Sequence, residues 1–549
     1  MSDPQTQSVS PQTESAGPLG ELALSFSGGG YRAAAFHLGA LRLLHRTELL
    51  RDVVALSTVS GGSIVGAAWV LSVLRGQPFG EFDRRFAEFL EKTNVIRDAL
   101  DHLTAHREHG HPSHPSLIRS AACVYARPEL FGDTRLGDID LGAQEAGGGR
   151  PRFREVIFNS TEFRTGVDFR FRRSVNPRAA VGNGNFRVPR EVAKNVRVAD
   201  AVAASSCFPG GFEPLLFPRH FDWPNDFPLE KAEEALGPKF DDGVALMDGG
   251  IWDNQGVDSL VLAFERGGAA TLVISDVAAR SNNIYGFPPA GRRGFVTLRM
   301  ASILGWLLFV AAVLSAGMLA WTGVDEWAEG ERGWTQIFLY AVPFVFSAAV
   351  AVTLGWMRIT LNKVQAQLKK TIHIPDVWKD LHKLTVLEAI GMITLRAESL
   401  LALTSSIFMK RIRGLIVSSV YKDPAYEGKR MMNLIYSLDE NRPKLFAAHP
   451  WLKPSDALRK LAKDAEAFPT TLWFDDPKQA GMVARAGEVT LCFTLLHFIV
   501  HERADDLKDP DSPVSRLFAR LRQEWDVFNG AAAARGGAVP AATAGIAGD

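Results

Sequence analysis

Apolar and polar positions alternate with two different periods over the first 280 residues of the chain. Residues 22–74 predict a strand, a helix, a strand and a second helix, and apolar side chains recur at helical spacing over 31–46. Residues 153–174 alternate like half-buried strands, and a buried strand at 271–275 follows a helix at 256–266. This order predicts an α/β fold in which helices cover a mainly parallel sheet.

Two long segments in the middle of the chain, 301–321 and 335–357, contain no charged residue. Each is long enough to cross a hydrocarbon core of about 30 Å as a helix. The connection at 322–334 is acidic, whereas basic residues flank both outer ends. The positive-inside rule then predicts a transmembrane hairpin in the cell (inner) membrane, with two spans and both large parts in the cytoplasm. The alternative is a buried helical hairpin, although such helices are usually shorter and interrupted by polar residues.

The overall composition excludes some classes of function. Lys and Arg together number 61, as do Asp and Glu, so the net charge is near zero and nothing indicates nucleic-acid binding. Three scattered cysteines predict neither a disulfide framework nor a zinc site. A histidine cluster has one pair at helical spacing but lacks the glutamate of a His-Glu-x-x-His motif, so a solvated loop is the simpler interpretation. The cluster comprises His102, His106, His109, His111 and His114.

Chemistry is expected at three glycine-rich turns, of which the first two follow short apolar strands. The first turn contains Gly28, Gly29 and Gly30, whose backbone N–H groups at a helix N-terminus form a candidate anion site. The second places Ser60 on a sharp bend between a strand and a helix, which is how an exposed nucleophile is presented. The third carries Asp248 in an Asp-Gly-Gly turn. An oxyanion site beside a presented serine is the minimum equipment for acyl transfer.

These three segments, with the stretch from Asp200 to Pro214, resemble the patatin-like phospholipase family over roughly residues 20–280. The resemblance implies a three-layer α/β/α fold and a Ser/Asp dyad without histidine, metal or cofactor. Ser60 would be the nucleophile and Asp248 the general base. The implied oxyanion donors are Gly28, Gly29 and Gly30, and the implied supporting residues are Arg32, Gly62, Gly249 and Gly250.

The chain departs from the family pattern at two positions. Thr58 stands two residues before the serine, where the family usually has glycine, and a β-branched residue is expected to crowd the bend. Ser27 precedes the glycine run, where many members have aspartate. Asp253 and Asp258 are neighbouring carboxylates that could be mistaken for the catalytic acid. Arg32 is expected to brace the glycine loop, to meet a lipid phosphate or to form an ordinary surface salt bridge.

The resemblance also suggests the domain organisation. A disordered leader at 1–20 precedes a catalytic domain at 21–290, and the hairpin at 300–358 is an insertion. A helical C-terminal part at 359–529 completes the catalytic domain, because Pro469 to Leu472 resembles the family's closing segment, and residues 530–549 form a disordered tail. Helices in that C-terminal part are predicted at 364–405, 410–433, 455–466 and 487–501.

The sequence thus predicts a membrane-anchored lipid acyl hydrolase of the phospholipase A or lysophospholipase type. Its expected partners are a phospholipid or lysophospholipid substrate and the bilayer, while its oligomeric state stays open. Two other functions remain: a non-lipid serine esterase or peptidase, and a catalytically impaired, membrane-tethered binding or signalling module.

Overall fold

The chain forms two compact units, which are described separately. Unit 1 comprises Met1–Asn282 and Ser405–Asp549, and unit 2 comprises Asn283–Thr404, so unit 2 interrupts unit 1 in the sequence. The computed structural model describes residues 17–105, 116–142, 151–237, 243–280, 294–329, 338, 341–350, 352–353, 355–356, 359, 363 and 383–534.

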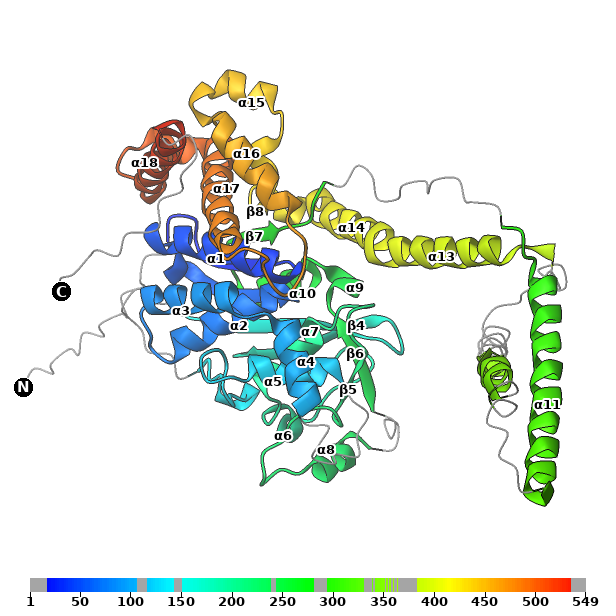
Figure 1. Ribbon diagram of the computed structural model, residues 1–549. Helices are drawn as coiled ribbons and strands as arrows, with labels where there is room; N and C mark the ends of the chain where they lie inside the picture. Colours follow the sequence, from blue (N-terminus) through cyan, green and yellow to red (C-terminus); the bar gives the residue numbers. More distant parts are fainter. Residues whose placement is uncertain are drawn as a thin grey trace, which may run out of the picture. The chain divides into compact units, whose positions relative to one another are not determined.

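A single mixed sheet forms the centre of unit 1 (Figure 1). Its strands are β1 (Leu22–Phe26), β2 (Val53–Val59), β3 (Glu155–Glu162), β4 (Val167–Ser174), β5 (Leu215–Phe217), β6 (Val244–Asp248), β7 (Thr271–Asp276) and β8 (Arg430–Leu434). The order is β5-β6-β3-β2-β1-β7-β8, with β4 paired to β3. The neighbouring strands β3, β2, β1, β7 and β8 are parallel to one another. The other pairs, β3 with β4, β3 with β6 and β5 with β6, are antiparallel. The predicted α/β fold with a mainly parallel sheet is confirmed.

Helices make up most of the rest of the described chain. Those of unit 1 are α1 (Gly30–Arg46), α2 (Gly61–Leu74), α3 (Phe79–Lys92), α4 (Val95–Ala105), α5 (Leu117–Tyr125), α6 (Arg190–Ala193), α7 (Val198–Ser205), α8 (Leu229–Leu236), α9 (Gly250–Asp253), α10 (Val257–Gly267), α14 (Met409–Lys422), α15 (Pro443–Ala448), α16 (Asp456–Ala467), α17 (Lys478–Glu502) and α18 (Pro513–Ala534). Unit 2 contains α11 (Leu298–Glu329) and α13 (Val386–Ala402). The prediction of one helix over 410–433 is wrong, because α14 ends at Lys422 and β8 then joins the sheet beside β7.

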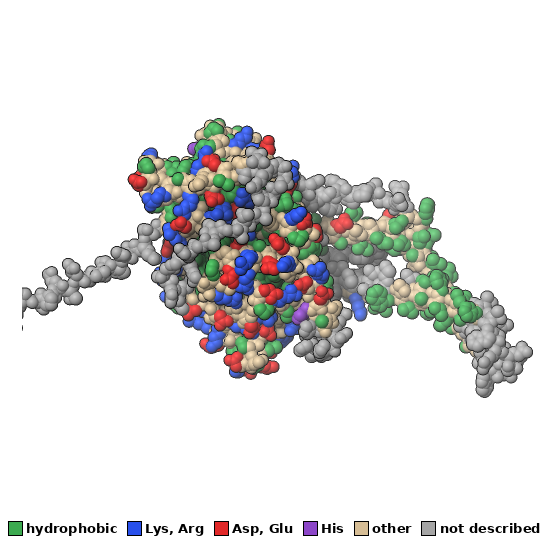
Figure 2. All heavy atoms as spheres, turned by 60° about the vertical axis from the view of Figure 1, so that its left-hand side comes forward, with side chains coloured by type: hydrophobic (Ala, Val, Ile, Leu, Met, Phe, Trp, Pro, Cys, Tyr) green, Lys and Arg blue, Asp and Glu red, His purple; other side chains and the backbone are tan. Residues whose placement is uncertain are grey.

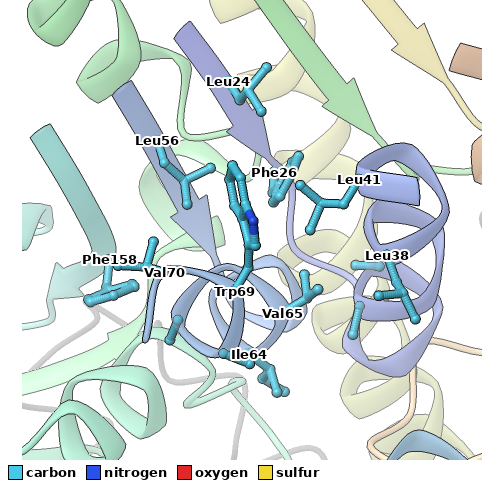
Figure 3. Close-up of a cluster of buried hydrophobic side chains, with 14 of the residues drawn as sticks. Leu24, Phe26, Leu38, Leu41, Leu56, Ile64, Val65, Trp69, Val70 and Phe158 are labelled. Carbon is cyan, nitrogen blue, oxygen red and sulfur yellow. The ribbon is translucent and has the colours of Figure 1, made fainter. Parts of the chain in front are cut away.

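Side chains that alternate along the strands build a core on each face of the sheet. On one face Leu24, Phe26 and Leu56 surround Trp69 of α2, which is 1% exposed (Figure 3). On the other face Ala23 and Ile274 belong to a second cluster, which also contains Val257, Leu260 and Ala263 of α10 and Val420 of α14. Because successive strand residues point to opposite faces, one apolar strand can serve both helix layers.

Close packing of α1 against α17 connects the two sequence-distant parts of unit 1. A Cβ added at Gly39 would lie 1.8 Å from the Ala484 carbonyl oxygen, and one added at Gly487 would lie 1.9 Å from the Phe36 carbonyl oxygen. Only glycine allows the two backbones to approach this closely. The C-terminal part therefore contributes both a strand and a core helix to the unit that begins with β1.

Two described helices are long and apolar enough to cross a membrane. The first is the segment Leu298–Met318 within α11 of unit 2, of whose most apolar stretch 6% is buried. Figure 2 shows hydrophobic side chains gathered over this unit, and Trp306 and Leu314 are 61% and 65% exposed. The second is α17, of which 83% is buried, so packing within unit 1 accounts for its apolar character.

The structure describes the predicted hairpin only in part. The backbone of α11 stays helical as far as Glu329, so this helix extends beyond the predicted end of the first span at residue 321. Within the second predicted span, residues 341–350 form a shorter apolar helix. Much of the remainder of 335–357, and residues 330–334 of the connection, lie outside the described residues.

Candidate active site

Ser60 occupies the bend between β2 and α2 with a backbone that few residues adopt. Its φ is +50° and its ψ is −120°, and it is one of two non-glycine residues with positive φ in the described chain. Left-handed conformations of this kind are strained for residues that carry a Cβ and persist where the surrounding structure enforces them. The bend leaves Ser60 8% exposed at the N-terminus of α2. The structure thus gives Ser60 the sharp turn expected of a presented nucleophile.

The two glycines after Ser60 allow α2 to begin directly against the first glycine turn. A Cβ added at Gly61 would lie 2.0 Å from the Gly30 carbonyl oxygen. A Cβ added at Gly62 would lie 2.4 Å from the Phe26 carbonyl oxygen. These contacts leave no room for a side chain, so Gly62 supports the site by permitting close backbone approach.

Thr58 is accommodated at the bend rather than crowding it. Its Oγ1 lies 2.9 Å from Ser63 Oγ and donates to the Ile157 carbonyl oxygen at 3.1 Å. A Cβ at Gly66 would lie 2.6 Å from the Thr58 methyl carbon, so the missing side chain on α2 makes space for that methyl group. The expected crowding is therefore corrected: Gly66 offsets the bulk of Thr58, whose hydroxyl joins the bend to β3.

Ser205, at the end of α7, connects the serine turn to the acid turn. Its Oγ accepts a hydrogen bond from the Ser60 N–H at 3.0 Å and lies 2.8 Å from Ser63 Oγ. Its carbonyl oxygen accepts from the Gly249 N–H at 3.3 Å. One buried residue thus fixes the backbone on both sides of the candidate dyad.

Asp248 ends β6 with its carboxyl group buried beside Ser60. Oδ1 accepts from the Gly250 N–H at 2.7 Å, and the Ser60 side chain favours the ionised carboxylate. Burial acts in the opposite direction and prevails, raising the pKa of Asp248 to about 6. Gly249 and Gly250 let the turn close, since a Cβ at Gly249 would lie 2.4 Å from the Asn159 carbonyl oxygen.

The first glycine turn offers two backbone donors rather than three. The Gly28 N–H already donates to the Asn254 carbonyl oxygen at 2.9 Å, which corrects the expectation that Gly28 is an oxyanion donor. Gly29 has φ +141° and Gly30 has φ +56°, so both need glycine's freedom. Within the described part of the chain, neither of their N–H groups has an acceptor, and they lie at the N-terminus of α1, where anions are favoured.

The family model for patatin-like phospholipases matches residues 24–261, which contain the serine, glycine and acid turns. The chain carries a patatin-like phospholipase domain. Seven chains of solved structures match, among them human GIVD cytosolic phospholipase A2, which is 14% identical with a TM-score of 0.30. That match covers 47% of this chain and 46% of the other, so it spans about half of each protein. None of the curated proteins matches. Family membership supports lipid acyl hydrolysis as the general class of activity.

In the patatin-like domain, Arg32 braces the glycine loop. Its Nη1 donates to the carbonyl oxygens of Glu466 at 2.8 Å and Phe468 at 2.6 Å, and the side chain is 7% exposed. Burial lowers the pKa of Arg32 to about 10. The adjacent Tyr31 N–H donates to the Thr471 carbonyl oxygen at 2.8 Å. The end of α16 and the segment after it therefore support the glycine loop from a part of the chain beyond residue 261.

The two neighbouring carboxylates have structural partners. Asp253 accepts hydrogen bonds from the N–H groups of Gln255 and Asp258, at 3.0 and 2.8 Å, and so stabilises the start of α10. Burial raises its pKa to about 7. Asp258 accepts from the Trp252 indole N–H at 3.2 Å. Among the described side chains, Ser60 lowers the pKa of Asp248 and acts on the pKa of neither neighbouring carboxylate.

His37, which lies close to the glycine turn, is a core residue of the patatin-like domain. His37 stacks on Phe26 with ring centroids 4.6 Å apart, and its ring nitrogens lie 3.1 Å from Ser275 Oγ and 3.2 Å from the Ser27 carbonyl oxygen. Burial lowers its pKa to about 3, so the ring is neutral at physiological pH. In the predicted histidine cluster, His102 lies 3.3 Å from Ser120 Oγ, and the other four members lie outside the described residues.

The start of α14 lies against the acid turn. A Cβ at Gly250 would be 3.0 Å from Met409 Cε and 2.6 Å from Asn254 Oδ1. Farther along α14, Arg413 forms a 2.7 Å ion pair with the buried Asp276 at the end of β7. The sequence alone predicted no role for Asn254, Ser205 or Met409. Ser205 stands inside the stretch from Asp200 to Pro214 and Asn254 shortly follows the Asp-Gly-Gly turn, but nothing in the local sequence indicated the long-range contacts of Met409.

Proposed function

We propose that the patatin-like domain is a serine acyl-ester hydrolase in which Ser60 and Asp248 act as a dyad. The observation that carries this proposal is a strained serine at the N-terminus of α2 whose side chain favours the ionised form of a buried carboxylate, Asp248. The pKa of Asp248, about 6, supports it further, because such a carboxylate is mostly ionised at pH 7 yet more basic than an exposed one.

Each group would have one task in the reaction. Ser60 Oγ attacks the ester carbonyl carbon while its proton passes to Asp248. The N–H groups of Gly29 and Gly30 stabilise the oxyanion of the tetrahedral intermediate. Collapse breaks the bond to the alcohol, which receives the proton from Asp248 and leaves an acyl-enzyme. Water then attacks the acyl carbonyl carbon while Asp248 takes its proton. The bond from the acyl group to Ser60 Oγ breaks, Ser60 Oγ receives the proton from Asp248, and the fatty acid leaves.

Apolar side chains near the acid turn support a lipid rather than a water-soluble ester as substrate. Phe208, next to the Cys207 carbonyl that accepts the Asp248 N–H, is 49% exposed. Trp252 of α9 is 38% exposed, and Ile407 and Phe408, just before Met409, are 40% and 51% exposed. Exposed aromatic and aliphatic side chains close to a catalytic turn favour contact with an acyl chain or a bilayer surface.

We further propose that the enzyme is anchored in the cell (inner) membrane by the hairpin at 300–358, with its catalytic part in the cytoplasm. The exposed apolar surface of α11 and the basic outer flanks of the hairpin support this topology. Anchoring would hold the dyad near phospholipid or lysophospholipid and raise the effective substrate concentration.

The deciding experiment for the dyad is hydrolysis by the full chain and by Ser60→Ala. Wild type should release fatty acid from a fluorogenic phospholipid or lysophospholipid and react with a fluorophosphonate probe, whereas Ser60→Ala should do neither. The matched control is Ser72→Ala, also on α2, whose Oγ donates only to the Trp69 carbonyl oxygen at 2.8 Å. Near-normal turnover by Ser60→Ala would remove it as nucleophile. Turnover of a peptide or soluble ester but not of lipid would instead favour a non-lipid hydrolase.

The anchor is tested separately by extraction and labelling. The protein should need detergent, not alkaline carbonate, for release from membranes. A cysteine introduced by Gly330→Cys should react with an impermeant thiol reagent in intact cells, and one introduced by Ala541→Cys only after permeabilisation. Release by carbonate, or protection of the first site, would contradict the hairpin without affecting the dyad.

A further inference from the structure

Unit 1 contains a cavity that the proposed reaction does not use. Its volume is about 540 Å³, and it lies between α15 and the C-terminal end of α17. Ligand pockets in proteins are typically about 300–1,000 Å³. None of the residues that line it belongs to the glycine, serine or acid turn. A space of this size could hold a medium-sized organic molecule.

Every ionisable side chain that lines the cavity is basic: Arg442, Lys444, His449, His497 and His501. Arg442 and Lys444 carry permanent positive charges, the three histidines add ring N–H donors, and the lining contains no carboxylate, so the space favours a ligand with negative charge. The remaining walls are largely apolar, with Leu445, Ala448 and Val500 among them. The lining therefore combines an anion-binding group with a surface for hydrocarbon.

Contacts outside the lining orient two of these basic groups. Arg442 is paired with Glu440 at 2.5 Å, and its guanidinium lies 5.4 Å from the centre of the Phe493 ring. His497 stacks on the same phenylalanine with centroids 6.2 Å apart and an interplanar angle of 10°. Side chains held in this way need little reordering when a ligand arrives, which limits the entropic cost of binding.

We propose that this cavity binds an anionic amphiphile, a molecule with a carboxylate or phosphate head group on an apolar chain. The head group contacts the basic side chains, with Arg442 and Lys444 as the permanent charges, and the chain lies against Leu445, Ala448 and Val500. A free fatty acid and a lipid phosphate share this chemistry. The site is independent of the dyad, and binding does not require the proposed hydrolysis.

The histidines add a dependence on pH. Burial, together with the charges of Arg442, His501 and His449, lowers the pKa of His497 to about 4, so its ring is neutral at pH 7. A bound anion stabilises the protonated ring and raises that pKa, so binding takes up a proton and affinity increases as pH falls. Two carboxylates near the cavity bear on this balance, because Glu440 pairs with Arg442 and Glu502 lies 3.3 Å from His501 Nδ1.

The test is calorimetric titration of the full chain in detergent with octanoate, octyl phosphate, octanol and inorganic phosphate, with empty micelles as background. We expect one molecule of octanoate or octyl phosphate to bind per chain, and octanol and inorganic phosphate to bind at least tenfold more weakly. The tighter of the first two probes identifies the head group. Equal binding of octanol, equal binding of inorganic phosphate, or binding of none of the probes would overturn the proposal.

Variants locate the binding to the cavity. Lys444→Gln, at an exposed position, should weaken octanoate at least fivefold, and Ala448→Trp should block it by filling the space. Lys453→Gln removes the same charge from an exposed position outside the lining and should leave affinity unchanged. Affinity of wild type should rise between pH 7 and pH 5, and His497→Gln should reduce that rise. Unaltered binding by both Lys444→Gln and Ala448→Trp, with unchanged unfolding temperatures, would exclude this cavity.

Discussion

Replacing Asp248 by asparagine should abolish ester hydrolysis and, at the same time, stabilise unit 1 at alkaline pH. The carboxylate is buried, and its pKa rises from the ordinary 3.8 to about 6 on folding. Asparagine has nearly the same shape and can still accept the Gly250 N–H through its carbonyl oxygen. It cannot ionise, so it avoids the cost of a buried charge, but it also cannot take the proton of Ser60.

The size and sign of the effect follow from this pKa. Between pH 3.8 and 6 the folded state binds more protons at Asp248 than the unfolded state, so the free energy of unfolding falls as pH rises through this window. A shift of roughly two pKa units corresponds to about 3 kcal/mol once both states are ionised. Asp248→Asn should therefore raise the free energy of unfolding by up to about 3 kcal/mol at pH 8 and by roughly half of that at pH 5.

The assay is unfolding by urea at pH 5 and pH 8, monitored by tryptophan fluorescence, alongside lipid hydrolysis. The matched control is Ser60→Ala, which should be equally inactive but should keep the pH dependence, since its Asp248 still ionises. An Asp248→Asn protein that hydrolyses lipid would refute the dyad. A stability gain of equal size at both pH values would refute the assignment of the raised pKa to this carboxyl group.

Three further substitutions test the geometry around the site. Gly66→Ala should cost about 1–3 kcal/mol of stability, because its Cβ would press on the Thr58 methyl group. Thr58→Ser keeps the hydroxyl but not the methyl group, so the double variant should regain most of that stability. Additive losses of the two substitutions on urea unfolding would contradict the contact. Ser60→Gly should be inactive yet more stable than Ser60→Ala by about 1 kcal/mol, because glycine adopts φ +50° without strain. Equal unfolding midpoints of these two variants would argue against strain at the bend. Arg32→Met should lower the unfolding midpoint by the equivalent of about 2–4 kcal/mol, since the carbonyl groups of Glu466 and Phe468 lose a buried donor beside the glycine loop. It should also reduce kcat more than it raises KM, and an unchanged kcat in folded protein would limit Arg32 to stability.

Local sequence was sufficient for the parts of this protein that depend on neighbouring residues. Apolar periodicity predicted the strands and helices around the serine turn, because a strand or helix face must be apolar wherever it is buried. The glycine runs predicted sharp turns, and the structure explains them by carbonyl oxygens within 2.4 Å of the missing Cβ atoms at Gly61 and Gly62. The resemblance to patatin-like phospholipases also rested on such local motifs, and it is confirmed over residues 24–261.

Other features could not be read from neighbouring residues, since they depend on groups that meet only in the folded chain. The strand β8 lies in a stretch predicted as helix, and its place beside β7 follows from pairing with a strand more than 150 residues earlier. The Gly28 amide looks like a free donor until the Asn254 carbonyl oxygen is seen to accept its hydrogen. Apolar composition alone would let α17 cross a membrane, yet it is a core helix because glycines bring it against α1.

The sequence by itself thus determined which residues carry the candidate chemistry, whereas the tertiary structure decided their state. Ser60 and Asp248 are identifiable from their turns, because turn geometry is encoded by the residues that form it. The raised pKa of Asp248 arises from burial of its carboxyl group, which the folded unit 1 alone provides. The role of Thr58 likewise depends on Ser63, Ile157 and Gly66. Hydrogen bonding and desolvation act through space, so only the assembled fold fixes how strongly each group is held and how readily it gives up or takes a proton.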